Sequence, residues 1–185
     1  MGYHGEDGKY RNTRTARIPL KFVTKLNGTP IPDFTNEAQP SMGYDLADSE
    51  SEAIRWNNDA APGAVVGGFE VPSDRRPNTP MTVCLLASKS GATVGDTCPF
   101  TLGVFFQTVG ALHDADADAG GDTTALVGGA PAKTVQKATR AIASADIPAP
   151  PAKCTVTCKP KATKLGTDDA FLHEAYVEYE QIIER

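Results

Sequence analysis

The stretch DADADAGGD, residues 114–122, places aspartates at Asp114, Asp116, Asp118 and Asp122. An EF-hand calcium loop has carboxylates at positions 1, 3 and 5, glycine at position 6 and glutamate at position 12. Counted from the first aspartate, the early carboxylates match, but position 6 is Ala119 and position 12 is Ala125. Asp114, Asp116 and Asp118 are therefore candidates only for another kind of calcium loop. The favoured interpretation is a solvated acidic loop between two strands, with no metal and no cofactor.

Hydrolytic chemistry needs a nucleophile, a base within hydrogen-bond reach and a third group that orients the base. The three histidines are spread along the chain. His4 lies near the start, His113 borders the acidic loop, and His173 alternates with apolar positions. No Gly-x-Ser-x-Gly motif is present. A glycosidase would need two carboxylates across a cleft, which a sequence alone does not reveal. We predict that the protein is not an enzyme.

Charge is concentrated at the start of the chain. Residues 1–25 carry six basic and two acidic side chains, a net of +4, so the rest carries −9 of the total of −5. We expect residues 1–16 to form an extended basic arm and residues 17–185 to form one folded domain. The predicted partner-binding residues of the arm are Lys9, Arg11, Arg14 and Arg17.

Nucleic acid and membranes are not expected as partners. The body of the protein is acidic and would be repelled by phosphate, and the arm lacks aromatic residues arranged for base stacking. No apolar run approaches the ~20 residues that a membrane-spanning helix needs. With 40% apolar and 22% charged residues, the composition is that of an ordinary globular domain.

The four cysteines do not have the spacing of a zinc site. Cys154 and Cys158 are four residues apart in a strand-like segment, which separates them by ~13 Å and prevents a bond between them. We expect buried thiols, with a cross-strand bridge from Cys84 to one of that pair as the alternative.

The hydrophobic periodicity is that of strands, because apolar residues alternate in short segments between Gly, Pro, Asn and Asp turns. The pair Gly67-Gly68 marks a bulge or a close backbone approach. Eight strands without helices predict an antiparallel β-sandwich of the jelly-roll kind. The expected strands are 18–26, 51–56, 64–72, 79–88, 99–112, 132–144, 153–161 and 169–183.

Three segments follow one another in a distinctive order: GGFEVPSDRRPNTPMTVCLLASKSGATVGD, FTLGVFFQTVG and KPKATKLGTDDAFLHEAYVEYE. In this order they resemble a recurrent family of tailed-phage virion proteins, over about residues 17–182. The resemblance implies a jelly-roll-like sandwich without catalytic residues. It also implies a capsid decoration (cement) protein that binds the major capsid protein and forms a homo-oligomer, with a trimer favoured. The matched residues include Asp74, Phe105, Asp168, Asp169 and Tyr176.

Two alternatives from other functional classes remain open. A carbohydrate-binding module or a phage tail or fibre domain would attach the virion to a host surface. A carbohydrate-binding module would need exposed aromatic side chains, and the candidates are Trp56, Tyr44 and Tyr176. A lone tryptophan in a strand, however, is more often a core anchor. A calcium-dependent fibre domain would instead use the acidic loop.

Overall fold

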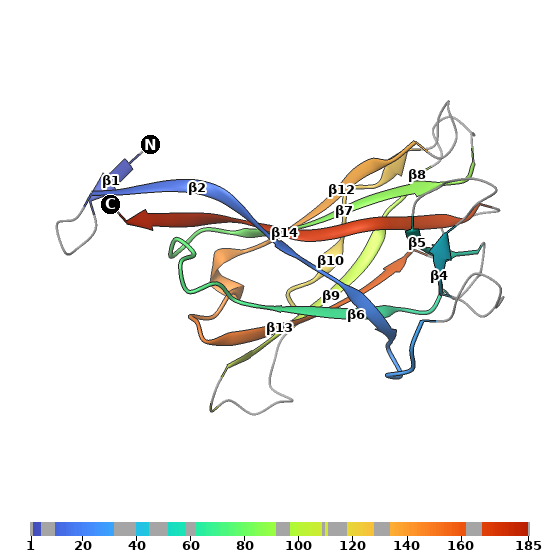
Figure 1. The fold of residues 1–185 in the computed structure, drawn as a ribbon, viewed down its shortest axis with the longest axis horizontal. Helices are drawn as coiled ribbons and strands as arrows, with labels where there is room; N and C mark the ends of the chain where they lie inside the picture. The colour runs from blue at the N-terminus through green and yellow to red at the C-terminus, as the bar shows by residue number, and fades with distance from the viewer. Residues whose placement is uncertain are drawn as a thin grey trace.

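The computed structural model describes a two-layer, antiparallel β-sandwich (Figure 1). The described residues are 2–4, 10–31, 40–44, 52–57, 62–91, 97–108, 110, 118–127, 134–161 and 168–184. The all-β, jelly-roll-like fold predicted from the strand pattern is confirmed. In the described part of the chain the helical structure is the 3-10 turn η1 (Ser144–Asp146), and no described helix is long and apolar enough to cross a membrane.

The first sheet is built around the long strand β14. On one edge β14 pairs with β7, which pairs with β12, and on its other edge it pairs first with β5 and then with β2. Strand β1 extends the sheet beyond β2, and β4 extends it beyond β5. The strands of this sheet are β1 (Gly2–His4), β2 (Tyr10–Pro19), β4 (Ser41–Tyr44), β5 (Glu52–Trp56), β7 (Met81–Lys89), β12 (Gln136–Ile142) and β14 (Ala170–Glu184).

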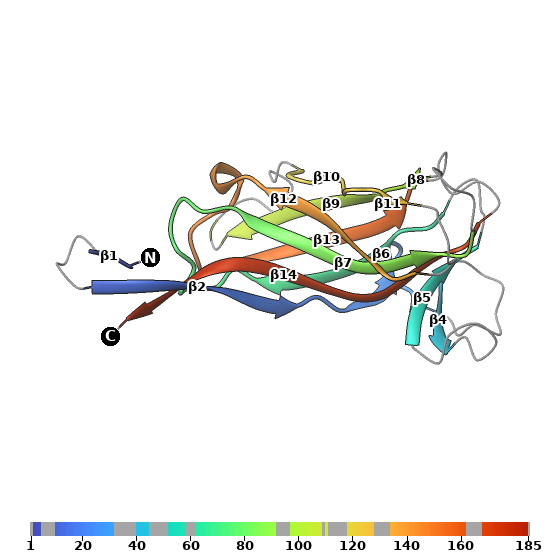
Figure 2. The same ribbon diagram turned by 90° about the horizontal axis from the view of Figure 1, so that it is seen from above.

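The second sheet has the order β10-β9-β13-β6-β3 and packs face to face on the first. Figure 2 shows the two layers from above. The strands of this sheet are β3 (Phe22–Lys25), β6 (Val65–Glu70), β9 (Phe100–Thr108), β10 (Gly121–Asp122) and β13 (Ala152–Pro160). A small ribbon of β8 (Thr97–Cys98) and β11 (Leu126–Val127) lies beside them.

The core is the set of inward positions at every second residue of each strand. In β7 these are Met81, Val83, Leu85 and Ala87, and all four are fully buried. The same alternation runs along β9 and β13, which brings apolar faces of both sheets together.

Seven of the eight predicted strands correspond to single strands of the structure, including 132–144, whose alanines could suggest a helix.

The eighth predicted strand, 18–26, is divided between the two sheets. Strand β2 ends at Pro19, the N–H of Leu20 donates one more hydrogen bond to the carbonyl of Ala175 on β14, and the chain then crosses to begin β3. The crossing chain passes so close to β6 that a Cβ on Gly67 would clash with the carbonyl oxygen of Lys21. The predicted close approach at the glycine pair is therefore confirmed, because only glycine leaves room for it.

The boundary expected at residue 16 falls inside a strand. Residues 10–16 belong to β2, and residues 11–16 pair along β14, with Arg11 opposite Glu184 and Ala16 opposite Tyr179. This part of the predicted arm is an ordered strand of the first sheet. Figures 1 and 2 show the ends of β2 and β14 running together beyond the body of the sandwich.

Candidate binding cleft

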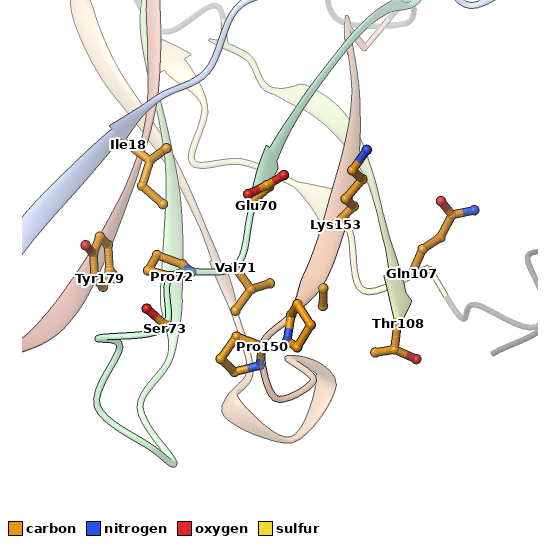
Figure 3. Close-up of a pocket in the computed structure, with 12 residues that line it drawn as sticks. Ile18, Glu70, Val71, Pro72, Ser73, Gln107, Thr108, Pro150, Lys153 and Tyr179 are labelled. Carbon is orange, nitrogen blue, oxygen red and sulfur yellow. The ribbon is translucent and has the colours of Figure 1, made fainter. Parts of the chain in front are cut away.

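A cleft of about 810 Å³ opens between the two layers where β2 and β14 leave the body (Figure 3). The first sheet contributes side chains of β2 and β14, and the second contributes the ends of β6, β9 and β13. We call it the end cleft. Its lining consists of Ile18, Glu70, Val71, Pro72, Ser73, Gln107, Thr108, Pro150, Pro151, Ala152, Lys153 and Tyr179.

The walls of the end cleft are mostly apolar and are held by backbone pairing. Val71 continues the line of β6, and its N–H donates to the carbonyl of Ala152 at 2.8 Å. Prolines at positions 72, 150 and 151 restrict the two loops beside this contact. An apolar, preformed wall of this kind is typical of small-molecule sites.

The wall on the first sheet is the ring of Tyr179. Its hydroxyl donates to Oδ1 of Asp74 at 3.1 Å, and Asp74 also accepts a hydrogen bond from the side chain of Gln181. Burial, followed by the neighbouring Asp74 charge, raises the pKa of the Tyr179 hydroxyl. The phenol therefore stays neutral and remains a donor across the physiological range.

The polar rim of the end cleft is one row across the second sheet. Lys153 of β13 lies opposite Gln107 of β9 on one side and opposite Glu70 of β6 on the other. All three side chains are exposed and rise from neighbouring strands (Figure 3). Together they offer an ammonium donor, an amide that donates and accepts, and a carboxylate acceptor. Each of them lies on the outward face of its strand, so the rim continues onto the outer surface of the sheet.

These lining residues were not among the sequence candidates. The alternation Lys-x-Thr-x-Thr-x-Lys from Lys153 to Lys159 was a usable signal for an outward polar face of β13. Nothing in the sequence indicated that Lys153 lines the same cleft as Ile18 and Tyr179, because those two residues belong to strands of the other sheet.

The predicted partner-binding arginines do not reach the end cleft. The Nε of Arg14 donates to Gln181 at 2.7 Å, and Arg17 forms an ion pair with Glu178 at 3.0 Å. Both partners lie on β14, so these basic side chains serve to pair β2 with its own sheet. Lys9 and the side chain of Arg11 lie outside the described residues.

Trp56 has to be corrected as a ligand-binding candidate. Its side chain is 0% exposed, packs edge-on against Phe100 at 5.9 Å, and donates from Nε1 to the carbonyl of Gly63 at 2.8 Å. A ring enclosed in this way has no face left for a sugar, so Trp56 is a core anchor. The side chain of Tyr44 lies outside the described residues.

Tyr176 is covered as well. It is 5% exposed, with the guanidinium of Arg17 at 4.6 Å and the ammonium of Lys137 at 5.6 Å from its ring centre. Glu178 pairs with both cations, and the hydrogen bond from Lys137 is the main reason why the pKa of Glu178 is lowered.

The described part of the acidic stretch is used to attach it to β9. Oδ1 of Asp118 accepts hydrogen bonds from the backbone N–H of Val104 and of Gly120, both at 2.8 Å. Asp122 accepts from Thr101 and pairs with Lys161. No cluster of three metal-ligating side chains occurs among the residues that the structure describes. The other two metal candidates, Asp114 and Asp116, lie outside them, as does His113.

His173 lies at an irregularity of β14, where the register with β7 shifts between Leu172 and Glu174. Its Nε2 is 2.9 Å from the hydroxyl of Ser88, and its ring stacks on Phe171. Ser88 is only 2% exposed, so its hydroxyl is not presented to a substrate. Partial burial lowers the pKa of His173. The side chain of His4 is not described.

None of the four cysteines forms a disulfide, and all are buried, as expected. Cys154 and Cys158 both point inward from β13. Burial raises the pKa of Cys154 to about 12 and that of Cys158 further, which keeps both thiols protonated and unreactive.

The virion-protein resemblance includes three aspartates, Asp74, Asp168 and Asp169, and each of them forms an ion pair or hydrogen bond within the fold. Asp168 forms an ion pair with the buried Lys89 at 2.9 Å, and Asp169 pairs with Arg55 at 3.2 Å. These contacts fix the start of β14 to β7 and β5. Asp74, in the first motif, attaches the 72–79 loop to β14.

No protein-family model matches this chain, and no curated protein matches it. Several solved structures are similar at low identity. They include the CBM35 module of Cellvibrio japonicus Abf62, with 8% identity, 92% of this chain and 97% of that chain covered, and a TM-score of 0.43. A xylan-binding module, CBM15, has 13% identity, 91% and 97% coverage, and a TM-score of 0.38.

The enzymatically active domain of tailspike protein 4 from bacteriophage CBA120 is also similar. It has 12% identity and a TM-score of 0.37. The match covers 93% of this chain but only 19% of the tailspike chain, so this chain spans a small part of that protein's length.

Proposed function

We propose that this protein is a non-enzymatic carbohydrate-binding β-sandwich that attaches its carrier to a glycan-bearing surface. The observation that carries the proposal is the end cleft, where apolar walls meet the exposed row of Gln107, Lys153 and Glu70. A sugar ring presents C–H faces together with hydroxyl groups that both donate and accept. The apolar walls can pack against the C–H faces, and the amide, ammonium and carboxylate of the row can form hydrogen bonds with the hydroxyl groups.

The end cleft is also suited to bind without reorganisation. Its walls rise from strands of both sheets and from loops restricted by proline, and the backbone of Val71 is hydrogen-bonded to β13. Binding to a preorganised site avoids the free-energy cost of ordering a loop around the ligand. Among the twelve lining residues, all of them described, Glu70 is the one carboxylate. The two-carboxylate arrangement of a glycosidase would need a second one, so the lining favours binding over hydrolysis.

The proposal is tested by electrophoresis of the intact protein through gels that contain a panel of plant and bacterial polysaccharides. We expect at least one polysaccharide to retard the protein, and Gln107→Ala or Lys153→Ala to reduce the retardation several-fold. Glu174→Gln, an exposed acid on the opposite sheet, is the matched control and should migrate like the parent protein. Retardation that is the same for the parent and both rim variants would overturn the role of the end cleft, and no retardation by any polysaccharide would overturn the function.

A second candidate function is the capsid decoration role that the sequence resemblance implies. The observation that favours it is the pair of strand ends, β2 and β14, which extend beyond the sandwich (Figures 1 and 2) and provide a contact surface apart from the end cleft. In this proposal the projecting strand pair binds the major capsid protein, and the chain forms a homo-oligomer, with a trimer favoured, on the virion. Co-sedimentation with empty capsids and mass measurement in solution test it. A monomer that stays in the supernatant would contradict it.

A further inference from the structure

We propose that the outer face of β9, β13 and β6 is a binding track for an acidic, carboxylate-bearing polysaccharide, with Phe105 as its aromatic platform. This inference rests on the proposed function and extends the same site, because the rim row of the end cleft is the first row of this face.

Phe105 lies on the outward face of the second sheet, whereas Phe100 and Phe106 point into the core. Its ring lies over Gly103, which precedes it by two residues on the same face of β9. A Cβ on Gly103 would lie 2.9 Å from Cε2 and 3.4 Å from Cζ of Phe105, and 2.6 Å from Oγ1 of Thr157. The absent side chain of Gly103 is thus what lets the ring settle against the sheet while part of it stays exposed.

The surface beside Phe105 is formed by small and polar residues. Thr155 lies opposite Phe105, and the exposed Gly68 follows on β6. The next row is Gly103, Thr157 and Val66. Gly103 on β9 and Gly68 on β6 lie on either side of the threonines of β13. Their missing side chains leave a shallow groove in which a polysaccharide chain can contact the Phe105 ring from the side. The ring's electron-rich face attracts polarised C–H groups, and the threonine hydroxyls supply hydrogen bonds.

Charge on this face favours an acidic ligand. Lys153 and Lys159 project outward from β13, six residues apart, which separates them by ~20 Å along the strand. Lys161 follows just beyond the strand and is paired with Asp122. Glu70 is the one acidic side chain that the structure describes on these three strands, since Asp122 belongs to β10. The face therefore has a small positive excess on a protein whose net charge is −5, and that excess is complementary to a polyanion.

The competing explanation is that Phe105 merely covers the backbone of Gly103, as aromatic side chains do for glycines in other sheets. The lysines would then be ordinary solvated side chains. Only a binding track predicts that the Phe105 ring and the two lysines affect the affinity for a polysaccharide, so binding measurements distinguish the two explanations.

The test uses the intact protein with polygalacturonate and with its fully methyl-esterified form, which has the same backbone without the charges. We expect polygalacturonate to bind at least tenfold more tightly in calorimetry, and the difference to shrink as salt is raised, because screening weakens exposed charge pairs. Lys153→Gln with Lys159→Gln should remove most of the preference, while Lys137→Gln, an exposed lysine on β12 of the other sheet, should retain it. Phe105→Ala should weaken binding of both forms tenfold or more.

Phe105→Leu keeps apolar bulk over Gly103 and serves as the folded comparison. It should bind as weakly as the alanine variant and unfold at nearly the parent temperature. Equal binding of the charged and esterified polymers, or full binding by the Phe105 variants, would overturn the track. The proposed function would survive that result if Gln107→Ala still lost glycan binding, and both would fail if neither polymer nor any neutral polysaccharide bound.

Discussion

The hydroxyl of Tyr179 donates a hydrogen bond to the carboxylate of Asp74 at 3.1 Å, which joins the 72–79 loop to the strand that forms one wall of the end cleft. The backbone strengthens the link, because the N–H of Ile182 donates to the carbonyl of Asp74 at 2.7 Å. The geometry of the wall therefore depends on one aspartate that the ligand itself need not touch.

Asp74→Ala should weaken both the fold and the binding site. It removes the acceptor of Tyr179 and of Gln181, and we expect the free energy of unfolding to fall by about 2 kcal/mol. Urea denaturation measures the change, with the exposed Asp146→Ala as control. Unchanged stability would show that these hydrogen bonds are replaced by water at no cost.

Removal of residues 1–16 should destabilise the sandwich, because the deletion takes away the part of β2 that pairs with β14 from Arg11 to Ala16. We expect the melting temperature to fall by about 5 °C or more, and the uncovered edge of β14 to promote self-association. Removal of residues 1–9 leaves β2 intact and is the matched control. If the longer deletion melts like the shorter one, the pairing contributes little to stability.

Gly67→Ala should be strongly destabilising, since the added methyl group clashes with the carbonyl of Lys21 where the chain crosses between sheets. A backbone atom cannot rotate away as a side chain can, so we expect a loss of about 2 kcal/mol or more. Val66→Ala, at the neighbouring and partly exposed position, should cost less. Thermal unfolding of the two variants under identical conditions makes the comparison.

Acidification should destabilise the protein through His173. Partial burial lowers the pKa of this imidazole in the folded state, so the folded protein binds a proton less readily than the unfolded chain does. The stabilising contribution is present above the ordinary histidine pKa of about 6.5 and is lost as the pH falls through the folded value. Melting temperatures between pH 7.5 and 5 should fall less for His173→Gln than for the parent. Parallel curves would exclude His173 as the source.

The thiols should react only after unfolding. All four are buried, and burial keeps the pKa of Cys154 near 12, so the thiolate that attacks a disulfide reagent is scarce at pH 8. Four equivalents should react promptly in denaturant and almost none in native buffer. Rapid labelling of the native protein would contradict the burial of these residues.

The sequence was sufficient for the strands that face the core, where alternation is enforced by burial on one side, as in β7 and β13. It was insufficient for the first half of β2. That segment, with Arg11 and Arg14, has polar side chains on both faces and is held by pairing with β14, so no period marks it. The basic charge of this segment predicts an arm, whereas its pairing with β14 leaves no pattern in the sequence.

The candidate site was harder to predict for the same reason. Trp56 and Tyr176 attracted attention by residue type, yet whether a strand residue faces the core or solvent depends on register, which a shift of one residue reverses. The lining of the end cleft comes from β2, β6, β9, β13 and β14, and no local pattern joins these elements. Phe105 stands out in the sequence only as one of the residues that carry the virion-protein resemblance, although the glycine two residues before it, Gly103, is visible there.

The most direct measurement of glycan binding by the end cleft is a titration of the isotope-labelled, intact protein with the polysaccharide that retards it most, followed by amide NMR shifts. We expect the shifted amides to concentrate at Gln107, Thr108, Lys153 and, in the 70–73 segment, at Glu70, Val71 and Ser73, and to saturate with one binding constant. Shifts confined to the opposite sheet around His173, or no shifts at a glycan concentration that retards the protein, would contradict it.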